Sequence, residues 1–167
     1  MKIKREALVD EYIMEALLLL MRKREYKDIS ITEICDKAGV TRMSFYRNFE
    51  GKEDVLKKWL TRITDDFLVT SGISYKNDST KAYFITLFTH LKQHQVICSA
   101  MHQAGLIYLV KEQFDRVFLQ IHRETYGDYK SYFLAGGIYN VYLLWLINGC
   151  KETPEEIACK MEDMLVK

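Results

Sequence analysis

The chain has 167 residues, of which 49% are hydrophobic, 13% aromatic and 28% charged, and its net charge is +1. The length excludes a large multidomain enzyme, and the composition excludes a disordered chain because it supplies enough apolar surface for a core. The near-neutral charge does not by itself indicate a nucleic-acid partner, although residues 1–62 carry 14 Lys and Arg against 11 Asp and Glu. One proline and eight glycines are few turn residues for a many-stranded protein, so an all-α fold is predicted.

The first predicted helix follows from an apolar stripe that begins at Val9 and ends near the basic residues 22–24. The helix dipole favours cations at that end. The apolar residues recur at helical spacing, and they are Val9, Ile13, Ala16, Leu17 and Leu20.

Two short helices are predicted next, over residues 31–38 and 42–49. Gly39 supplies the left-handed residue that ends the first, and Thr41 is the expected N-cap of the second. Phe45 and Phe49 share the buried face of the second helix, whose other face is polar and basic. Two short helices joined by a tight turn with a glycine predict a helix-turn-helix, and a fourth helix is predicted over residues 52–67.

The stretch 31–56 also carries a specific pattern. Its residues are Ala38-Gly39-Val40 at the turn, the pair Tyr46-x-x-Phe49 at the end of the second short helix, and Lys52. In this pattern the stretch resembles the N-terminal domain of the TetR family of transcriptional regulators, with Cys35 departing from it where the family usually has alanine. The resemblance implies a three-helix DNA-binding domain and a palindromic double-stranded DNA operator as its partner.

In a helix-turn-helix the second helix enters the major groove, and its first residues reach the base edges. Arg42 is the strongest candidate for reading a base, because a guanidinium can donate to O6 and N7 of guanine together. The resemblance implies that Tyr46 and Lys52 bind backbone phosphates and that Thr32 supplies a capping hydroxyl near the DNA. The residues placed at the base edges are Thr41, Arg42, Met43, Ser44 and Arg47.

The rest of the chain is predicted to form further helices. Apolar stripes indicate helices over residues 79–94, 96–103 and 106–123, and Gly127 marks a break. The next helix, over residues 130–147, is apolar on two faces, so one face packs on its own domain and the other needs a separate partner. A last helix begins at Thr153-Pro154-Glu155-Glu156, which provides an N-cap, a proline at the first position and an acid at the third.

The segment from Ala135 to Met164 is similar to the C-terminal domain of a Firmicute-type subgroup of the same family, which dimerises there. The resemblance rests on the glycine-containing apolar helix and the Thr-Pro-Glu-Glu cap. A homodimer is therefore expected, with four helices meeting at the contact. The residues expected at the interface are Gly136, Asn140, Leu143, Ile147, Ile157, Met161 and Met164.

The family resemblance also implies a pocket for a small-molecule inducer inside the C-terminal helices. Aromatic residues and a methionine at helical spacing are equally typical of a plain hydrophobic core, and the sequence does not identify a ligand. The candidate pocket residues are Phe84, Phe88, Met101, His102, Tyr108, Phe114, Phe118 and Tyr142.

The remaining chemical features of the sequence are weak. His90, His94 and Cys98 have a spacing that can bind a metal, but exposed histidines are the ordinary explanation, so no metal and no cofactor are expected. No motif of a catalytic site is present, so an enzyme is not expected. Four scattered cysteines, the absence of a signal-peptide pattern and an apolar stretch too short to cross a membrane favour a cytoplasmic protein without a membrane partner.

Together these features predict three units: a helix-turn-helix DNA-binding domain (1–50), a connecting helix (51–70) and a regulatory and dimerisation domain (71–167). The predicted function is that of a ligand-responsive repressor that binds its operator as a homodimer. Two alternatives stay open. One is an activator or co-regulator whose C-terminal domain binds a protein partner, and the other is a ligand-binding dimer without operator affinity.

Overall fold

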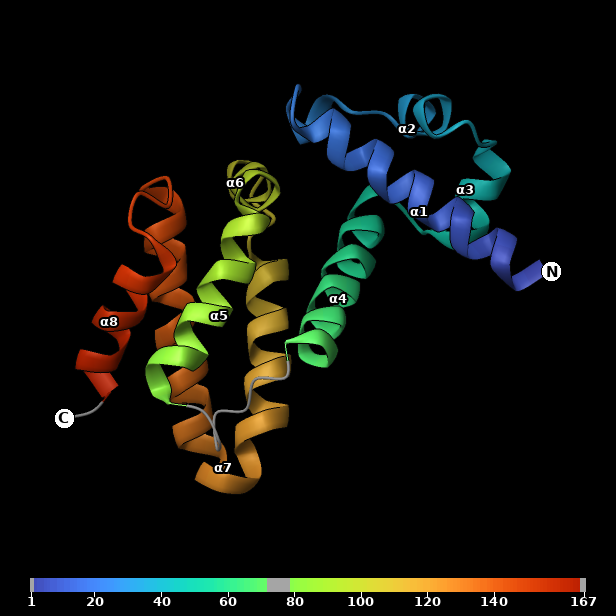
Figure 1. Cartoon of the computed structure of the whole chain (residues 1–167). Helices are drawn as coiled ribbons and strands as arrows, with labels where there is room; N and C mark the ends of the chain where they lie inside the picture. Colours follow the sequence, from blue (N-terminus) through green and yellow to red (C-terminus); the bar gives the residue numbers. More distant parts are fainter. Residues whose placement is uncertain (1, 72–78, 166–167) are drawn as a thin grey trace.

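The structure is a computed structural model that describes residues 2–71 and 79–165, and in these ranges it is all-α, as predicted (Figure 1). Gly51 precedes α4, which links the two ends of the molecule. The elements in chain order are α1 (Lys2–Met21), η1 (Tyr26–Asp28), α2 (Ile31–Ala38), α3 (Arg42–Asn48), α4 (Lys52–Thr70), α5 (Thr80–Gln93), α6 (Gln95–Gln103), α7 (Tyr108–Ile147) and α8 (Pro154–Leu165).

The N-terminal helices form a small bundle at one end of the molecule (Figure 1). Helix α1 contacts α2, α3 and α4, and it begins at Lys2, earlier than the apolar stripe from Val9 indicates. Ile13 and Leu17 of the predicted stripe are fully buried, as are Ile34 of α2 and Phe45 of α3. The helices are therefore held together by the apolar faces that the sequence periodicity indicates.

Local signals fix the ends of the two short helices. Ser30 caps α2 by accepting a hydrogen bond from the Glu33 N–H, and the Glu33 carboxylate accepts one from the Ser30 N–H, which completes a capping box. Gly39 has φ 66° and ends α2 in the left-handed conformation that the sequence predicts. The hydroxyl of Thr41 accepts a hydrogen bond from the Ser44 N–H at 3.1 Å, so Thr41 is the N-cap of α3, as predicted.

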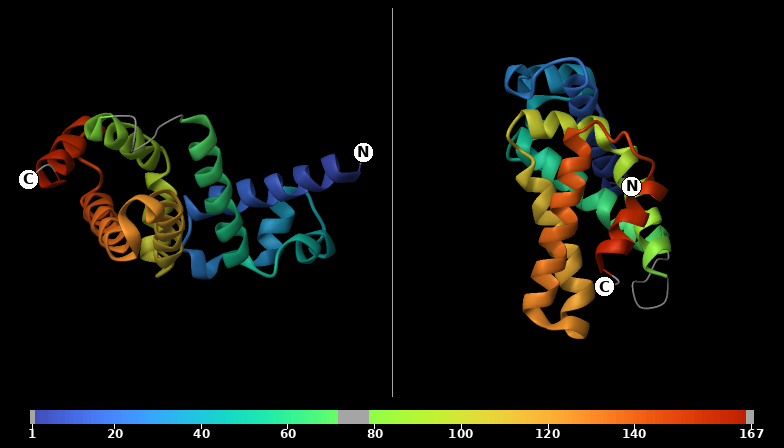
Figure 2. Two further views of the ribbon diagram at one scale, coloured as in Figure 1. Left: turned by 90° about the horizontal axis from the view of Figure 1, so that it is seen from below. Right: turned by 90° about the vertical axis from the view of Figure 1, so that its left-hand side faces the viewer.

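Helix α7 consists of two limbs that reverse direction at Gly127. This glycine has φ 71° and ψ 174°, a conformation that other residues rarely adopt, so it separates the predicted helices as expected. We call residues 108–126 the first limb and residues 128–147 the second limb. The views from two sides show the limbs side by side, projecting away from the N-terminal bundle (Figures 1 and 2).

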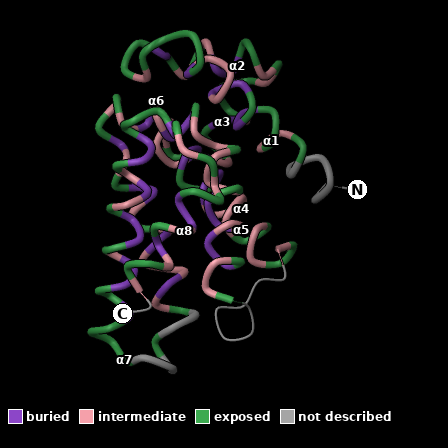
Figure 3. The backbone as a smooth tube through the Cα atoms, turned by 60° about the vertical axis from the view of Figure 1, so that its left-hand side comes forward, coloured by how far each residue is buried: buried purple, intermediate pink, exposed green. Residues whose placement is uncertain are grey.

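Helix α8 packs along α5, and its start is fixed by the predicted cap. The Glu156 N–H donates to the Thr153 hydroxyl at 3.2 Å, while the Glu156 carboxylate accepts from the Thr153 N–H at 2.7 Å. Between the helices of this domain the core is aromatic, with the rings of Phe88 and Trp145 5.3 Å apart. Figure 3 shows that buried residues follow the inward faces of these helices, while their outward faces are exposed.

Helix α4 joins the two ends because it is packed into both. Its first turns bury Val55 and Leu56 in the N-terminal bundle, and its later turns lie against α7. Arg116 of α7 forms an ion pair with Asp65 of α4 at 2.8 Å. A displacement of the C-terminal half of α4 would therefore also move its N-terminal end, which packs against the N-terminal bundle. Among the helices described, none is long and apolar enough to cross a membrane.

Candidate nucleic-acid interface and ligand cavity

Helix α3 has one buried and one exposed face. Phe45 is fully buried, whereas Arg42, Tyr46 and Arg47 are exposed and Met43 is 82% exposed. A methionine with that exposure contributes nothing to this chain's own core. The arrangement leaves the predicted reading surface of the helix open to a partner.

The exposed cations of α3 have no carboxylate partner among the described residues, whereas several cations of α4 do. Elsewhere Lys57 pairs with Glu53 at 3.0 Å and Lys58 pairs with Asp54 at 3.1 Å. Neither Arg42 nor Arg47 forms an ion pair with any residue that the structure describes, and the Arg42 guanidinium lies 5.9 Å from the centre of the Tyr46 ring. Their charge is therefore available to an anionic partner.

Two of the residues predicted at the base edges also have partners within α3. The Thr41 hydroxyl caps the helix and lies 3.1 Å from the hydroxyl of Ser44, and the Asn48 amide donates to the Ser44 carbonyl. These bonds hold the start of the helix in shape. The side chains of Thr41 and Ser44 are consequently less free to reach a base than those of Arg42 and Met43, which are exposed and have no such bond.

The structure corrects the expected role of Thr32. The capping hydroxyl of α2 belongs to Ser30, and Thr32 is an exposed residue in the first turn of the helix. The sequence carried a signal for this, because Ser30 and Glu33 have the spacing of a capping box. A DNA contact by Thr32 stays a prediction.

Lys52 has internal partners that the sequence did not predict. Its ammonium donates to the carbonyls of Tyr26 at 2.8 Å and Ile29 at 2.5 Å, and it lies 4.4 Å from the centre of the Tyr26 ring. Burial lowers the pKa of this ammonium, partly offset by Asp28 and Glu33. An ammonium has three donors, so two carbonyls leave one for the predicted phosphate contact. Lys52 also ties the start of α4 to the segment before α2.

The second limb of α7 carries an exposed apolar face. Phe133 is 75% exposed and Leu144 61% exposed, and Asn140, of the predicted interface, is exposed as well. Their spacing places them on one side of the helix. We define the α7 face by seven residues, which are Tyr129, Tyr132, Phe133, Gly136, Asn140, Leu144 and Ile147.

Two residues predicted at the interface are buried inside the chain instead. Ile157 is 4% exposed and Met161 is 3% exposed, because this side of α8 packs against α5. Neither can contact a second chain without opening that packing. Met164 follows on the same side of α8 but is exposed near the end of the helix, and Leu143 is partly buried.

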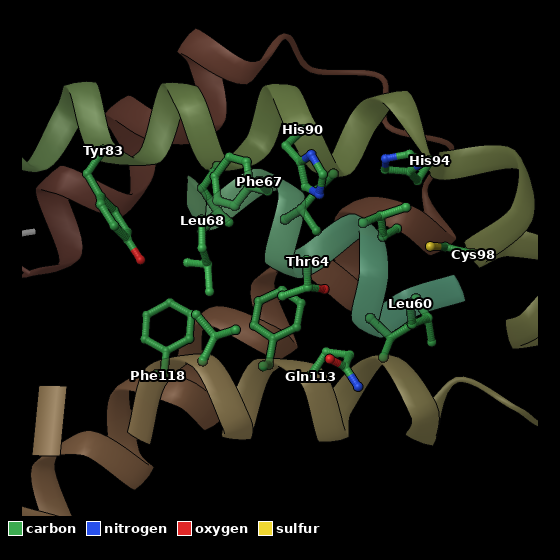
Figure 4. Close-up of a pocket in the computed structure, with 16 residues that line it drawn as sticks. Leu60, Thr64, Phe67, Leu68, Tyr83, His90, His94, Cys98, Gln113 and Phe118 are labelled. Atoms are coloured by element: carbon green, nitrogen blue, oxygen red, sulfur yellow. The ribbon is translucent and has the colours of Figure 1, made fainter. Parts of the chain in front are cut away.

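A cavity lies between α4, α5 and the first limb of α7, with Cys98 of α6 at one end (Figure 4). The space between these helices is about 790 Å³ when the part open to solvent is counted, and the cavity volume proper is about 80 Å³. Its walls are mostly apolar with a few polar side chains, as in small-molecule sites. The side chains that line it are Leu60, Ile63, Thr64, Phe67, Leu68, Tyr83, Leu87, His90, Leu91, His94, Cys98, Val110, Gln113, Phe114, Val117 and Phe118.

The lining differs from the predicted pocket. Of the predicted residues, Phe114 and Phe118 line the cavity. Tyr108 is exposed and its hydroxyl bonds to Glu53, while His102 lies outside the cavity on α6. The others belong to the core behind the wall: Phe84, Phe88, Met101 and Tyr142.

Helix α4 supplies a wall that the prediction omitted, because it treated α4 as a connector. The signal was present in the apolar residues that continue along this helix past the N-terminal bundle, such as Ile63 and Phe67. The spacing of His90 and His94 in the sequence indicates one side of a helix, which the structure shows to face the cavity. No group of three or more His, Cys, Asp or Glu side chains placed to hold a metal occurs within residues 2–71 and 79–165.

The two cavity histidines contact aromatic rings of α4. His90 stacks on Phe67 with ring centres 4.3 Å apart, and His94 lies edge-on to Trp59 at 5.5 Å. The two imidazoles are 4.9 Å apart. Burial, with a smaller contribution from His94, lowers the pKa of His90 to about 4, and burial also lowers the pKa of His94. Both rings are therefore neutral at pH 7.

We expect the stability of the wild-type protein to fall between pH 7 and pH 5 more steeply than that of His90→Phe. The pKa of His90 is lower in the folded protein than in the unfolded chain, so the unfolded state binds more protons below pH 6.5 and is favoured as the pH falls toward 4. Phenylalanine keeps the stacking on Phe67 but does not titrate. Thermal unfolding across this range measures the difference, with His102→Phe as the control, and parallel curves for wild type and His90→Phe would contradict the assignment.

Two models of known protein families match this chain, one in its N-terminal part and one in its C-terminal part. A family model described as bacterial regulatory proteins of the TetR family matches residues 13–58, and one described as a transcriptional regulator C-terminal region matches residues 78–167. An uncharacterised HTH-type transcriptional regulator of Bacillus subtilis strain 168, YxbF, is 28% identical over 171 residues. The match covers 92% of this chain but 43% of that relative, so the chain spans less than half of its length.

Solved structures of the same architecture cover almost the whole chain. A TetR transcriptional regulator from Streptococcus agalactiae 2603V has a TM-score of 0.70 at 19% identity, covering 98% of this chain and 97% of its own. The dihydroxyacetone kinase operon activator DhaS has a TM-score of 0.65 at 17% identity, covering 95% and 94%. The fatty acid degradation regulator FadR from Bacillus halodurans has a TM-score of 0.62 at 17% identity, covering 93% of each chain. At these identities the matches show a shared fold.

Proposed function

Because this chain belongs to the TetR family of transcriptional regulators and has its helix-turn-helix DNA-binding domain, we propose that it is a ligand-responsive repressor that binds a palindromic operator as a homodimer. The observation that carries this proposal is the exposed face of α3. Arg42 and Arg47 lie there without ion-pair partners in the described part of the chain, beside the exposed Met43. A helix with such a face can enter the major groove and contact both bases and phosphates.

The α7 face supports the homodimer. Large apolar side chains such as Phe133 and Leu144 are exposed together on one helix, and a contiguous apolar surface of this kind is uncommon on a monomer. The same face on a second copy would cover it through a two-fold contact, in which residues near the axis meet themselves. Such a dimer presents two copies of α3 to two half-sites about 34–36 Å apart, which is one turn of DNA.

The cavity supports control by a ligand. Leu60, Thr64 and Phe67 form its wall on α4, and the first turn of the same helix contacts the DNA-binding domain through Lys52 and Val55. A ligand that prefers one position of α4 favours one spacing of the two α3 helices in the dimer. It changes operator affinity by the ratio of its affinities for the two states.

The salt dependence of binding to duplex DNA tests this function, and the variant Lys52→Ala tests the predicted phosphate contact of Lys52. We expect the wild-type affinity to fall steeply with salt, and Lys52→Ala to bind more weakly to every sequence with a salt slope reduced by about one. The reason is the loss of one phosphate contact.

Lys57→Ala is the matched control, because Lys57 pairs with Glu53, whose carboxylate also bonds to the Tyr108 hydroxyl. It should keep the wild-type slope. An unchanged slope in folded Lys52→Ala would assign Lys52 to its two carbonyl contacts alone, and wild-type binding that is insensitive to salt would contradict the proposed function.

A further inference from the structure

The cavity between α4, α5 and α7 has walls that restrict the chemistry of its ligand. None of its lining residues is Asp, Glu, Lys or Arg. A cationic ligand would therefore lose its water without gaining a negative partner, which is costly in an apolar site. The apolar residues of the lining suit a hydrocarbon body, so the polar end of the ligand must be recognised by the few polar side chains.

Among these polar side chains, the imidazoles of His90 and His94 and the hydroxyl of Thr64 have no hydrogen-bond partner in the described ranges. The contacts of the two imidazoles are with aromatic rings. The amide of Gln113, in contrast, already donates to the Thr61 hydroxyl at 3.4 Å and accepts from Arg116 at 3.0 Å. The unmet hydrogen-bonding capacity of the cavity therefore lies at the histidine pair and at Thr64, and of these groups only the imidazoles can become charged.

The cavity is also asymmetric along its length. Figure 4 shows His90, His94 and Cys98 toward one end and Leu68 and Phe118 toward the other, where Tyr83 reaches in from α5. A molecule with one polar end and an apolar body matches this order. The two imidazoles are 4.9 Å apart, close enough for the two oxygens of one carboxylate to accept a hydrogen bond from each.

We propose that the cavity binds an apolar molecule that ends in a single carboxylate, with the carboxylate held by His90 and His94 and the apolar body lying toward Leu68 and Phe118. This inference names the ligand of the ligand-responsive regulator proposed above and rests on that function. A carboxylate fits better than a neutral acceptor because a histidine can gain a proton and become its counter-ion.

Binding of this ligand is linked to pH. In the empty cavity His90 is neutral, its pKa lowered to about 4, and a bound carboxylate favours its charged form. The complex takes up protons from solvent, and affinity for the ionised ligand rises as the pH falls from 7 toward 5. The other titratable lining groups are Tyr83, His94 and Cys98, from α5 and α6, and α4 and α7 contribute none.

The contact of His90 with α4 gives this ligand a route to the DNA-binding domain. The His90 ring stacks on Phe67, so a change in its charge or position acts directly on α4. A protonated imidazole on the face of an aromatic ring is attracted to it. The bound carboxylate therefore alters the contact between α4 and α5 and does not simply fill space between them.

Three probes with the same ten-carbon chain test the proposal: decanoate, decanol and decyltrimethylammonium, each below its micelle-forming concentration and titrated calorimetrically into the full chain. We expect decanoate to bind at least tenfold more tightly than decanol, and decyltrimethylammonium to bind least. In two buffers of different ionisation enthalpy, decanoate binding should show proton uptake. Equal affinity for the three probes, or no binding of decanoate, would overturn the proposal.

Variants separate the anchor from the cavity. His90→Phe and His94→Phe should each weaken decanoate binding about tenfold or more and leave decanol binding unchanged, which shows that the cavity is intact. His102→Phe, outside the cavity, should bind decanoate like the wild type. Decanoate affinity that is unchanged in both cavity variants would overturn the assigned anchor.

Operator release is a separate measurement. If decanoate binds through the histidines but leaves DNA affinity unchanged, the ligand class stands and the ligand-responsive function fails. If the protein binds DNA but does not bind decanoate, the ligand class fails and the DNA-binding function stands.

Discussion

Replacement of Arg42 with alanine is expected to lower affinity for the operator by about 1–3 kcal/mol, which is roughly fivefold to 150-fold, and to remove the base preference at one position of each half-site. Arg42 lies in the first turn of α3, is exposed, and has no ion pair in the described ranges. Its charge contacts the ring of Tyr46 and no carboxylate, so little of its interaction with DNA is offset by a lost internal bond. Binding to a panel of operators with single base changes measures both effects.

The control for Arg42→Ala is Arg123→Ala. Arg123 is an exposed cation just before the reversal of α7 at Gly127, and it pairs with Asp128. This end of α7 lies far from α3 (Figure 1). Arg123→Ala changes the net charge by the same amount as Arg42→Ala and should leave operator affinity and base preference unchanged. A uniform loss on every operator variant in Arg42→Ala would show a phosphate contact and would reject the reading of a base.

Leu144→Glu is expected to produce a folded monomer whose operator affinity is lower by about 100-fold or more. Leu144 lies within the α7 face and is 61% exposed, so glutamate is solvated in the monomer but buried without a partner in the proposed dimer. A monomer binds one half-site at a time and loses the gain from the second, which is typically 10²- to 10⁴-fold for linked sites. Analytical ultracentrifugation gives the mass, and circular dichroism confirms that the helices remain.

Val69→Glu is the matched control, since Val69 is a highly exposed apolar residue on α4 outside the α7 face. It should remain a dimer with wild-type operator affinity. A Leu144→Glu protein that is still dimeric and binds the operator normally would show that the two chains meet elsewhere.

The sequence predicted the helix-turn-helix because its signals are local. Gly39 requires a left-handed turn, Thr41 caps the next helix, and Phe45 falls on the buried face, all within a few residues. The same reasoning placed Gly127 at the reversal of α7 and Thr153 at the start of α8. The capping box of Ser30 was equally local and could have been found from its spacing.

The features that the sequence did not predict depend on how helices rotate against one another. The periodicity of α8 marked Ile157 and Met161 as apolar, but it could not tell burial against α5 from burial against a second chain. Lys52 reaches carbonyls more than twenty residues earlier in the chain, which no local pattern encodes. The cavity lining combines four helices, so aromatic residues at helical spacing predict only two of its members, Phe114 and Phe118.

Selection from a pool of random DNA duplexes by the purified wild-type protein, followed by sequencing of the retained fraction, tests the central claim most directly. The account predicts enrichment of a palindrome whose half-sites lie about 34–36 Å apart, and loss of that enrichment in Arg42→Ala. Binding that is weak, blind to sequence and lost at physiological salt would contradict it, and would leave a ligand-binding protein without an operator.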